Sequence, residues 1–309
     1  MRANQSWYVI FVFDGLTNDP TLELSLFIMF LLIYTFTILG NGGLIVLIMK
    51  SPILHTPMYF FLKHLSFIDM CYTSVIIPRT LSDILSTRKT VTLLACVVQL
   101  YFYSSLFISE VYLLSAMACD RYVAICKPLL YHLIMKKEKC VLLIGICFAI
   151  GFSESVIHAK NTFSLIYCNT HIAHFFCDMP PVLKLSCTDT TVTELVVFVV
   201  VGFNSFVCVS VIVISYSYIF CAILRIQSAQ GKLKAFTTCS SHLISTGTLF
   251  GTLIYMYMRP NSSYLNDQDK VVSVFYTMVI PMLNPIIYSF RNKDVQKAFV
   301  KLTRLKTEE

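Results

Sequence analysis

The stretch Met117-Ala-Cys-Asp-Arg-Tyr-Val-Ala-Ile-Cys126 places an Asp-Arg pair at the end of a long apolar segment. Charged side chains are costly inside a bilayer, so they occur there mainly where they have a function or reach its edge. The segment before it carries one charge, Glu110, and the segment after it is basic and contains Pro128. We therefore interpret this stretch as the cytoplasmic end of a membrane-spanning helix.

The composition of the whole chain agrees with a membrane protein. Of its 309 residues, 56% are hydrophobic and 13% are charged, whereas about a quarter of an ordinary soluble protein is charged. Seven apolar runs approach or exceed the roughly 20 helical residues needed to cross a hydrocarbon core. These predicted spans are Leu24–Met49, Met58–Ile84, Cys96–Ile125, Cys140–Ile157, Val192–Ile226, Ala235–Met258 and Val271–Tyr288. A basic amphipathic stretch, Asp294–Leu302, is predicted to lie on the membrane surface. We expect one all-α seven-helix domain over residues 1–309.

The distribution of Lys and Arg predicts the orientation of this bundle. If the N-terminus is outside, sixteen of these residues lie on the cytoplasmic side and eight outside, as the positive-inside rule requires. Residues 1–23 are then extracellular and residues 291–309 form a cytoplasmic tail. Asn4 begins a glycan acceptor triplet in the outer segment, and Asn261 begins a second candidate triplet in the last outer loop. The net charge of +7 thus belongs to the inner loops, and we expect no nucleic-acid partner.

Four cysteines fall on the oxidising side of the membrane. They are Cys96, at the outer end of the third span, and Cys168, Cys177 and Cys187, in the loop between the fourth and fifth spans. Four such cysteines predict two disulfides, and the residues alone leave three pairings open. The spacing His171-x-x-His174-x-x-Cys177 also suits a metal site, but disulfides already account for the cysteines.

Two carboxylates lie at one depth in the membrane. Helical rise places both Asp69 and Glu110 about 16–18 Å from the inner edge. Both cannot be charged in a dry interior, so either one is protonated or the two share a cation. The functional hypothesis is a Na⁺ site with Asn41 and Asn284 as neighbours, and no other cofactor is expected. The alternative is a structural pair that shares a proton.

Five motifs, in order along nearly the whole chain, resemble those of vertebrate olfactory receptors, a subfamily of the rhodopsin-like G-protein-coupled receptors. They are Leu54-His-Thr-Pro-Met-Tyr-Phe-Phe-Leu62 with Leu65-Ser-Phe-Ile-Asp69, then Met117–Cys126, Ser215-Tyr216, Lys234-Ala-Phe-Thr-Thr-Cys-Ser-Ser-His242 and Pro281-Met-Leu-Asn-Pro-Ile-Ile-Tyr288. The chain departs from the family pattern at Cys119, where Tyr is usual, and at Phe250, which lacks the usual hydroxyl.

The resemblance implies the fold and several site residues. It implies disulfides Cys96–Cys177 and Cys168–Cys187, and a cytoplasmic switch for a G protein. The switch residues would be Asp120, Arg121, Tyr122, Tyr216, Asn284, Pro285 and Tyr288. For Arg121 alone, the simpler interpretation is a cytoplasmic anchor paired with Asp120.

Residues that share helical faces match the position of the family's odorant cavity. They are Tyr103, Ser104, Phe107, Ile108, Met179, Val200, Val201, Asn204, Phe250, Leu253, Ile254 and Tyr257. For each face, the alternative is ordinary helix packing. A cavity with this lining suits a small, mostly apolar, neutral ligand. Tyr103 stands where amine receptors have Asp, and the seventh span has no Lys for a retinal Schiff base.

The function implied is that of a plasma-membrane odorant receptor that is not an enzyme. Its partners would be an odorant, the bilayer and a heterotrimeric G protein of the stimulatory, olfactory type that raises cyclic AMP. One alternative is a rhodopsin-like receptor for another small molecule. A transporter or an intramembrane hydrolase is a further alternative, but the sequence has neither paired halves nor a nucleophile with a base.

Overall fold

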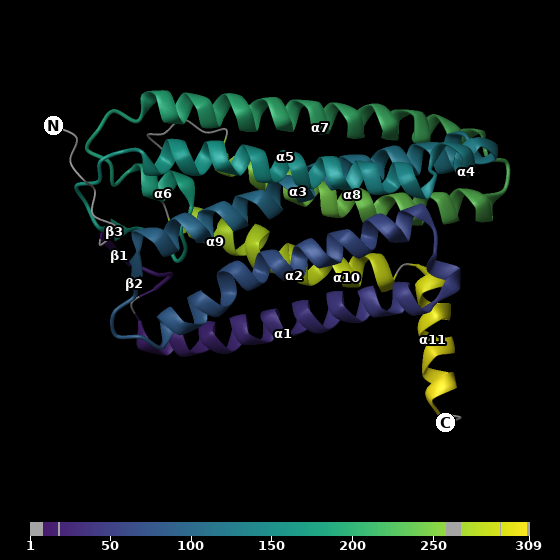
Figure 1. The fold of residues 1–309 in the computed structure, drawn as a ribbon. Helices are drawn as coiled ribbons and strands as arrows, with labels where there is room; N and C mark the ends of the chain where they lie inside the picture. Colours follow the sequence, from purple (N-terminus) through teal and green to yellow (C-terminus); the bar gives the residue numbers. More distant parts are fainter. Residues whose placement is uncertain (1–8, 18, 258–266, 291, 308–309) are drawn as a thin grey trace.

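A computed structural model describes residues 9–17, 19–257, 267–290 and 292–307 as a bundle of long helices (Figure 1). The two candidate glycan triplets at Asn4 and Asn261, and Met258 at the end of the predicted sixth span, lie outside these residues. The long helices are α1 (Pro20–Lys50), α2 (Pro57–Ile84), α3 (Leu93–Cys126), α5 (Lys137–Phe163), α7 (Thr191–Arg225) and α8 (Ala229–Tyr257). The predicted seventh span consists of α9 (Asp267–Val274), the π-helical turn η4 (Phe275–Val279) and α10 (Ile280–Phe290).

The chain is a multi-pass membrane protein with seven spans. Within the described residues, six helical segments are long and apolar enough to cross a membrane. The remaining span is α8, which has similar length but carries several Ser, Thr and His residues between 237 and 248. Within the apolar stretch of each helix that could cross the membrane, 56% of the residues are buried in α2 and in α3, but only 17% in α1. Most of α1 therefore faces lipid, whereas α2 and α3 form the centre of the bundle.

Local sequence explains where several helices begin. Proline occupies the first position of α1 and of α2, where its missing N–H costs no helical hydrogen bond. The Asp19 side chain accepts from the Thr21 N–H at 2.9 Å and caps α1. The helix α5 begins at Lys137 and continues to Phe163, beyond the predicted end at Ile157. The structure thus confirms the spans and moves some of their ends.

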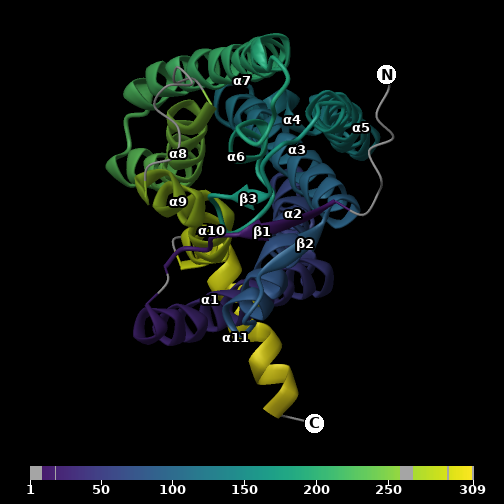
Figure 2. The ribbon, with the colours of Figure 1, turned by 90° about the vertical axis from the view of Figure 1, so that its left-hand side faces the viewer.

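A small sheet covers one end of the bundle, which the sequence analysis did not predict. It contains β1 (Ile10–Phe13), β2 (Thr90–Thr92) and β3 (His171–Ile172) in the order β2-β1-β3. The strand β1 pairs antiparallel with β2 and parallel with β3. Figure 2 views the molecule from this end, with the sheet lying across it. A second, smaller core forms beneath the sheet, where Phe11 and Ile172 are fully buried.

The opposite end carries the short loops and a final helix. The turn between α1 and α2 contains η1 (Pro52–Leu54), and η2 (Pro128–Leu130) and α4 (Tyr131–Ile134) connect α3 to α5. The last helix, α11 (Lys293–Thr307), turns away from the bundle (Figure 1). It buries Val295 and Ala298 and exposes Phe299, which is the pattern of a surface helix with its apolar side toward lipid.

Candidate functional site

Two disulfides hold the loop between α5 and α7 over the end of the bundle. Cys96, in the first turn of α3, is bonded to Cys177, and Cys168 is bonded to Cys187. These are the pairs expected from the family resemblance. The loop also contains the short helix α6 (Met179–Leu183). Because the first disulfide joins the loop to the central helix, residues 176–179 remain close to the space between the helices.

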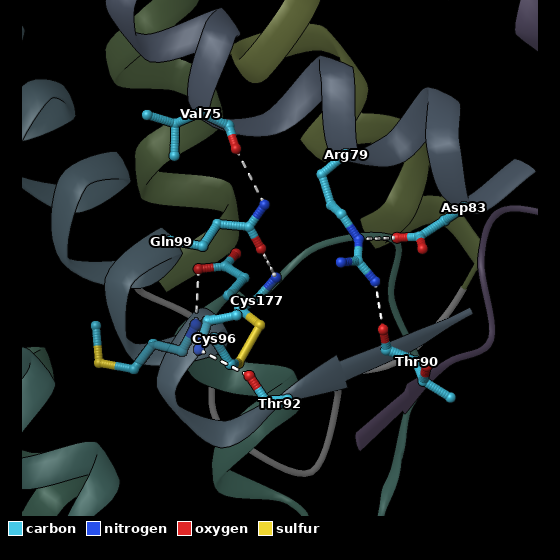
Figure 3. Close-up of a disulfide and its surroundings, with 11 residues drawn as sticks. Val75, Arg79, Asp83, Thr90, Thr92, Cys96, Gln99 and Cys177 are labelled. Carbon is cyan, nitrogen blue, oxygen red and sulfur yellow. Dashed lines mark hydrogen bonds and ion pairs between the residues drawn. A yellow bond between two sulfur atoms is a disulfide. The ribbon is translucent and has the colours of Figure 1, made fainter. Parts of the chain in front are cut away.

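Polar side chains support this disulfide from the neighbouring helices (Figure 3). The Gln99 amide nitrogen donates to the Val75 carbonyl of α2 at 3.1 Å, and its oxygen accepts from the Cys177 N–H at 3.0 Å. Arg79 pairs with Asp83 at 2.9 Å and also donates to a carbonyl of β2. The three elements α2, α3 and the loop are therefore connected at one level.

A cavity of about 50 Å³ lies directly below the loop. Nine of the twelve predicted ligand-binding residues line it: Tyr103, Ser104, Phe107, Ile108, Met179, Val201, Asn204, Leu253 and Tyr257. Of the other three, Val200 and the buried Phe250 do not line it, and Ile254 is 47% exposed on the outside of α8. The cavity is small beside the 300–1,000 Å³ typical of ligand sites. A bound ligand would therefore require side chains to move.

One end of the cavity is closed by a carboxylate and three tyrosines. The Asp178 carboxylate accepts from the hydroxyls of Tyr257 at 2.9 Å and Tyr276 at 3.0 Å, and from the Met179 N–H at 2.8 Å. The Tyr103 hydroxyl lies 2.9 Å from that of Tyr257. Burial raises the pKa of Asp178, and these hydrogen bonds partly offset that effect. The arrangement connects the loop to α3, α8 and η4.

Two other polar side chains on the wall have atoms without a partner. His158 on α5 and Ser205 on α7 both line the cavity and are 2% and 7% exposed. The His158 Nδ1 and the Ser205 Oγ are buried and have no hydrogen-bond partner among the described residues. In contrast, the Ser104 hydroxyl already forms hydrogen bonds with the Leu100 carbonyl at 2.7 Å and with the Ser155 hydroxyl at 2.9 Å. A buried polar atom without a hydrogen bond costs about 1–3 kcal/mol. A ligand would therefore gain the most binding free energy by hydrogen bonding to the His158 and Ser205 atoms.

Asn204 lines the cavity, but its amide is occupied by protein groups. Its nitrogen donates to Glu154 of α5 at 2.6 Å, and its oxygen accepts from the Tyr112 hydroxyl of α3 at 2.8 Å. The side chain therefore ties α3, α5 and α7 together. A polar contact between this amide and a ligand would have to use its second N–H or the second lone pair of its oxygen, in addition to these bonds.

The two deep carboxylates lie in a buried polar region between α1, α2, α3 and α10. Asp69 and Glu110 are no more than 1% exposed and interact electrostatically. The Asn284 amide donates to Asp69 at 3.0 Å and accepts from Ser245 of α8 at 2.8 Å. Three oxygens have no hydrogen-bond partner among the described residues: Asn41 Oδ1, Asp69 Oδ1 and Glu110 Oε1. Oxygen donors of this kind suit a hard cation.

At the other end of α3, two of the predicted switch residues, Asp120 and Arg121, form an ion pair with each other. One Asp120 oxygen accepts from Arg121 at 2.8 Å, and the other accepts from the Tyr131 hydroxyl of α4 at 2.8 Å. The next residue, Tyr122, points elsewhere and packs its ring 5.6 Å from that of Tyr218 on α7. The local pairing of Asp120 with Arg121 thus coexists with a tether to the segment that connects α3 to α5.

A histidine that the sequence analysis quoted but did not assign connects three helices at this end. The Tyr216 ring stacks on His242 of α8 at 5.7 Å, and its hydroxyl lies 2.9 Å from the His242 Nδ1. The His242 Nε2 lies 3.0 Å from the Leu114 carbonyl of α3. Because a carbonyl only accepts, Nε2 carries the proton and Nδ1 accepts from Tyr216. His242 thereby holds α7 and α8 against α3.

The remaining switch residues lie in the seventh span. Tyr288 is buried, 7% exposed, and Pro285 packs against Gly40 of α1, where a Cβ would lie 3.1 Å from the proline ring. Four residues of these sites were not among the predicted site residues: Asp178, His158, Ser205 and His242. The available signals were an acidic residue beside a disulfide cysteine, and two histidines within apolar spans.

Comparisons with known proteins point to one family. A family model described as olfactory receptor matches residues 30–306. The chain is 50% identical to Olfactory receptor 5AR1 of Mus musculus over 303 residues, which is 97% of each chain. It is also 50% identical to Olfactory receptor 8D1 of Homo sapiens, again over 97% of each chain. It is 50% identical to Olfactory receptor 5AU1 of Homo sapiens, over 99% of this chain and 85% of that protein.

Proposed function

Because the chain belongs to the olfactory receptor family, whose members are G-protein-coupled receptors and not enzymes, we propose that its odorant binds in the cavity below the disulfide-linked loop. The expected ligand is a small, neutral, mostly apolar molecule. The lining supports this proposal, since Phe107, Val201 and Leu253 provide apolar surface. The one carboxylate on the lining, Asp178, already accepts hydrogen bonds from protein groups.

The observation that carries the proposal is the pair of unsatisfied atoms on a mostly apolar wall. His158 Nδ1 and Ser205 Oγ lie on α5 and α7, on the same cavity. A ligand with one oxygen function, such as an alcohol, a ketone or an ester, would satisfy one or both atoms. An alkane would leave both unsatisfied, at about 1–3 kcal/mol each. Oxygenated odorants should therefore activate the receptor at lower concentrations than alkanes of equal length.

Two adjacent residues of α8 provide a matched test of the cavity. Leu253 lines the cavity and is 6% exposed, whereas Ile254 has an isomeric side chain and is 47% exposed on the outside. In cells with a cyclic-AMP reporter, an odorant panel should show a shifted concentration dependence for Leu253→Ala. Ile254→Ala should respond like wild type. Equal effects of the two substitutions, at equal surface expression, would contradict this location of the ligand.

We further propose that the inner end of the bundle couples to a stimulatory, olfactory-type G protein and raises cyclic AMP. The Arg121 guanidinium is held by Asp120, and His242 holds α8 close to α3. Activation would release these contacts and open a cleft for the G protein, which the basic inner loops would help to attract. Arg121→Ala should abolish the odorant-driven signal while surface expression persists. A full response from this variant would refute the switch assignment.

The proposed location is the plasma membrane with the N-terminus outside. The count of sixteen basic residues inside against eight outside supports this orientation. An N-terminal epitope should be stained on intact cells, and a C-terminal epitope only after permeabilisation. We also propose glycosylation at Asn4, and Asn261 as a second candidate. Loss of a glycosidase-sensitive mass shift in Asn4→Gln would assign the first site.

We also propose that a sodium ion binds between Asp69 and Glu110 and favours the resting receptor. This proposal is supported by three buried oxygens without a hydrogen-bond partner among the described residues, one from each of the two carboxylates and one from Asn41. Replacing Na⁺ by a large organic cation should then increase the odorant response of wild type. Asp69→Asn, which keeps a polar side chain but removes a charge, should show no such dependence. Sodium dependence that survives this substitution would favour the proton-sharing alternative.

A further inference from the structure

A second, larger hollow of about 600 Å³ lies at the end of the bundle opposite to the sheet. It lies between the end of α1, the turn η1, the start of α2, and α4 with the start of α5. Figure 1 shows these segments at the same end of the molecule. We call this hollow the inner groove. Its lining residues are Ile48, Met49, Leu54, His55, Thr56, Pro57, Phe60, Lys63, His132, Met135, Lys136, Lys137 and Cys140. The odorant cavity and the predicted switch share none of these residues.

The inner groove has one basic side. Lys63, Lys136 and Lys137 line it together with two exposed histidines. Within the described ranges, no carboxylate forms an ion pair with any of these lysines. The carboxylate nearest in sequence, Glu138, is exposed and does not line the groove. Several positive charges thus surround a space that contains no compensating negative charge.

Two long helices begin at the groove, and neither has a side-chain cap. The helix α2 starts at Pro57 after Thr56, and α5 starts at Lys137 after Lys136. All four residues line the groove, and neither preceding side chain accepts a hydrogen bond from the helix it precedes. Uncapped N–H groups and the positive end of the helix dipole favour an anion such as a phosphate. Both helix ends therefore reinforce the charge of the lysines.

The other side of the inner groove is apolar. Ile48, Leu54 and Met135 are buried there, and Phe60 lies beneath the Lys63 ammonium group, which is 5.3 Å from its ring centre. Met49, beside them, is 55% exposed. This end of the bundle also carries the amphipathic helix α11, so the groove lies at the level of the membrane surface. A soluble phosphate would use only the basic side, whereas a lipid would use both.

From these four observations we propose that the inner groove binds the headgroup of an anionic phospholipid that carries phosphomonoester groups, with its acyl chains along the apolar side. The cytoplasmic position of the groove rests on the orientation proposed above. The phosphates lie against the three lysines and the first turns of α2 and α5. A lipid held there connects α1, α2 and α5 beside the inner loop that tethers Asp120.

The test measures lipid retained by the purified full-length receptor. The wild-type receptor is placed in nanodiscs of phosphatidylcholine that contain phosphatidylinositol 4,5-bisphosphate. It is then released from the nanodisc, and native mass spectrometry measures the lipid that it retains. The triple variant Lys63→Gln, Lys136→Gln, Lys137→Gln should bind this lipid about a hundredfold more weakly, since each lysine near a phosphate contributes about 1 kcal/mol. A matched control, Lys232→Gln, Lys297→Gln, Lys301→Gln, removes equal charge from exposed residues outside the groove. It should change binding by about threefold or less.

Three results would overturn the proposal. Equal loss in both triple variants would mean that binding follows overall surface charge. Equal retention of phosphatidylserine at matched total charge would mean that phosphomonoesters are not recognised. Competition by soluble inositol 1,4,5-trisphosphate at the affinity of the lipid would mean that the apolar side contributes nothing. If the first triple variant fails to fold, the double variant of the exposed Lys136 and Lys137 replaces it. Because both leaflets of a nanodisc carry the lipid, the result is independent of orientation and of odorant signalling.

Discussion

A close contact between α3 and α5 offers a quantitative test of the structure. Gly151 of α5 packs directly against α3, where a Cβ on Gly151 would overlap the Ser109 hydroxyl and the Ser105 backbone carbonyl. Small residues allow helices in membranes to approach this closely. The substitution Gly151→Ala would therefore force α3 and α5 apart. One of the overlapping atoms belongs to a helical backbone, so a side-chain rotation alone cannot relieve the overlap.

The magnitude follows from two opposing effects. Overpacking a well-packed position costs about 1–3 kcal/mol, while replacing glycine by alanine within a helix gains at most about 1 kcal/mol. We expect Gly151→Ala to lower the free energy of unfolding by up to about 2 kcal/mol. Gly145, in the same helix, has no atom within 4 Å of its Cβ position. Gly145→Ala should therefore stabilise the protein by up to about 1 kcal/mol, and the difference between the two variants isolates the steric cost.

The measurement is thermal unfolding of the purified receptor in one detergent or nanodisc, followed by the reactivity of its buried cysteines. Gly151→Ala should unfold at a lower temperature than wild type, and Gly145→Ala at the same or a higher temperature. Surface expression should follow the same order. If Gly151→Ala is as stable as Gly145→Ala, the close approach of α3 and α5 described above is wrong.

Three further predictions use the same unfolding measurement. Burial lowers the pKa of His174 to about 3. Below pH 6.5, the ordinary pKa of about 6.5 means that His174 binds a proton in the unfolded chain but not in the folded loop. The free energy of unfolding should therefore fall by up to about 1.4 kcal/mol for each pH unit below 6.5. His174→Gln should lose that part of the slope. Removing the Cys96–Cys177 disulfide should cost about 4.5 kcal/mol and removing Cys168–Cys187 about 3.2 kcal/mol, because the first closes the longer loop; equal losses would contradict the loop-entropy account. Asn284→Ala leaves Asp69 without its hydrogen-bond donor and should destabilise by about 1–3 kcal/mol, whereas an unchanged unfolding temperature would contradict that bond.

The spans and their order could be predicted because a bilayer restricts the chain along one dimension. A helix that crosses lipid must satisfy its own backbone and present apolar side chains over a fixed length. Apolar runs therefore show where each span lies, and helical rise predicts one depth for Asp69 and Glu110. Residue order alone did not predict the sheet, because Ile10–Phe13 and Thr90–Thr92 are short segments that lie far apart in the sequence. It also missed the π-helical turn at Phe275–Val279.

Which residues face one another depended on the packing of the helices. In a soluble helix the polar side indicates the outside, but here both the lipid side and the core side are apolar. Leu253 and Ile254 could not be distinguished by residue type, and only the rotation of α8 puts the first on the cavity and the second toward lipid. Likewise, the hydrogen-bond partners of Asn204 come from other helices, Glu154 from α5 and Tyr112 from α3. Residue order was enough to identify the family and the spans, because motifs and apolar runs are read along the chain. Tertiary structure decided the partners of each polar group and the shape of both cavities, because those depend on how the helices rotate and approach.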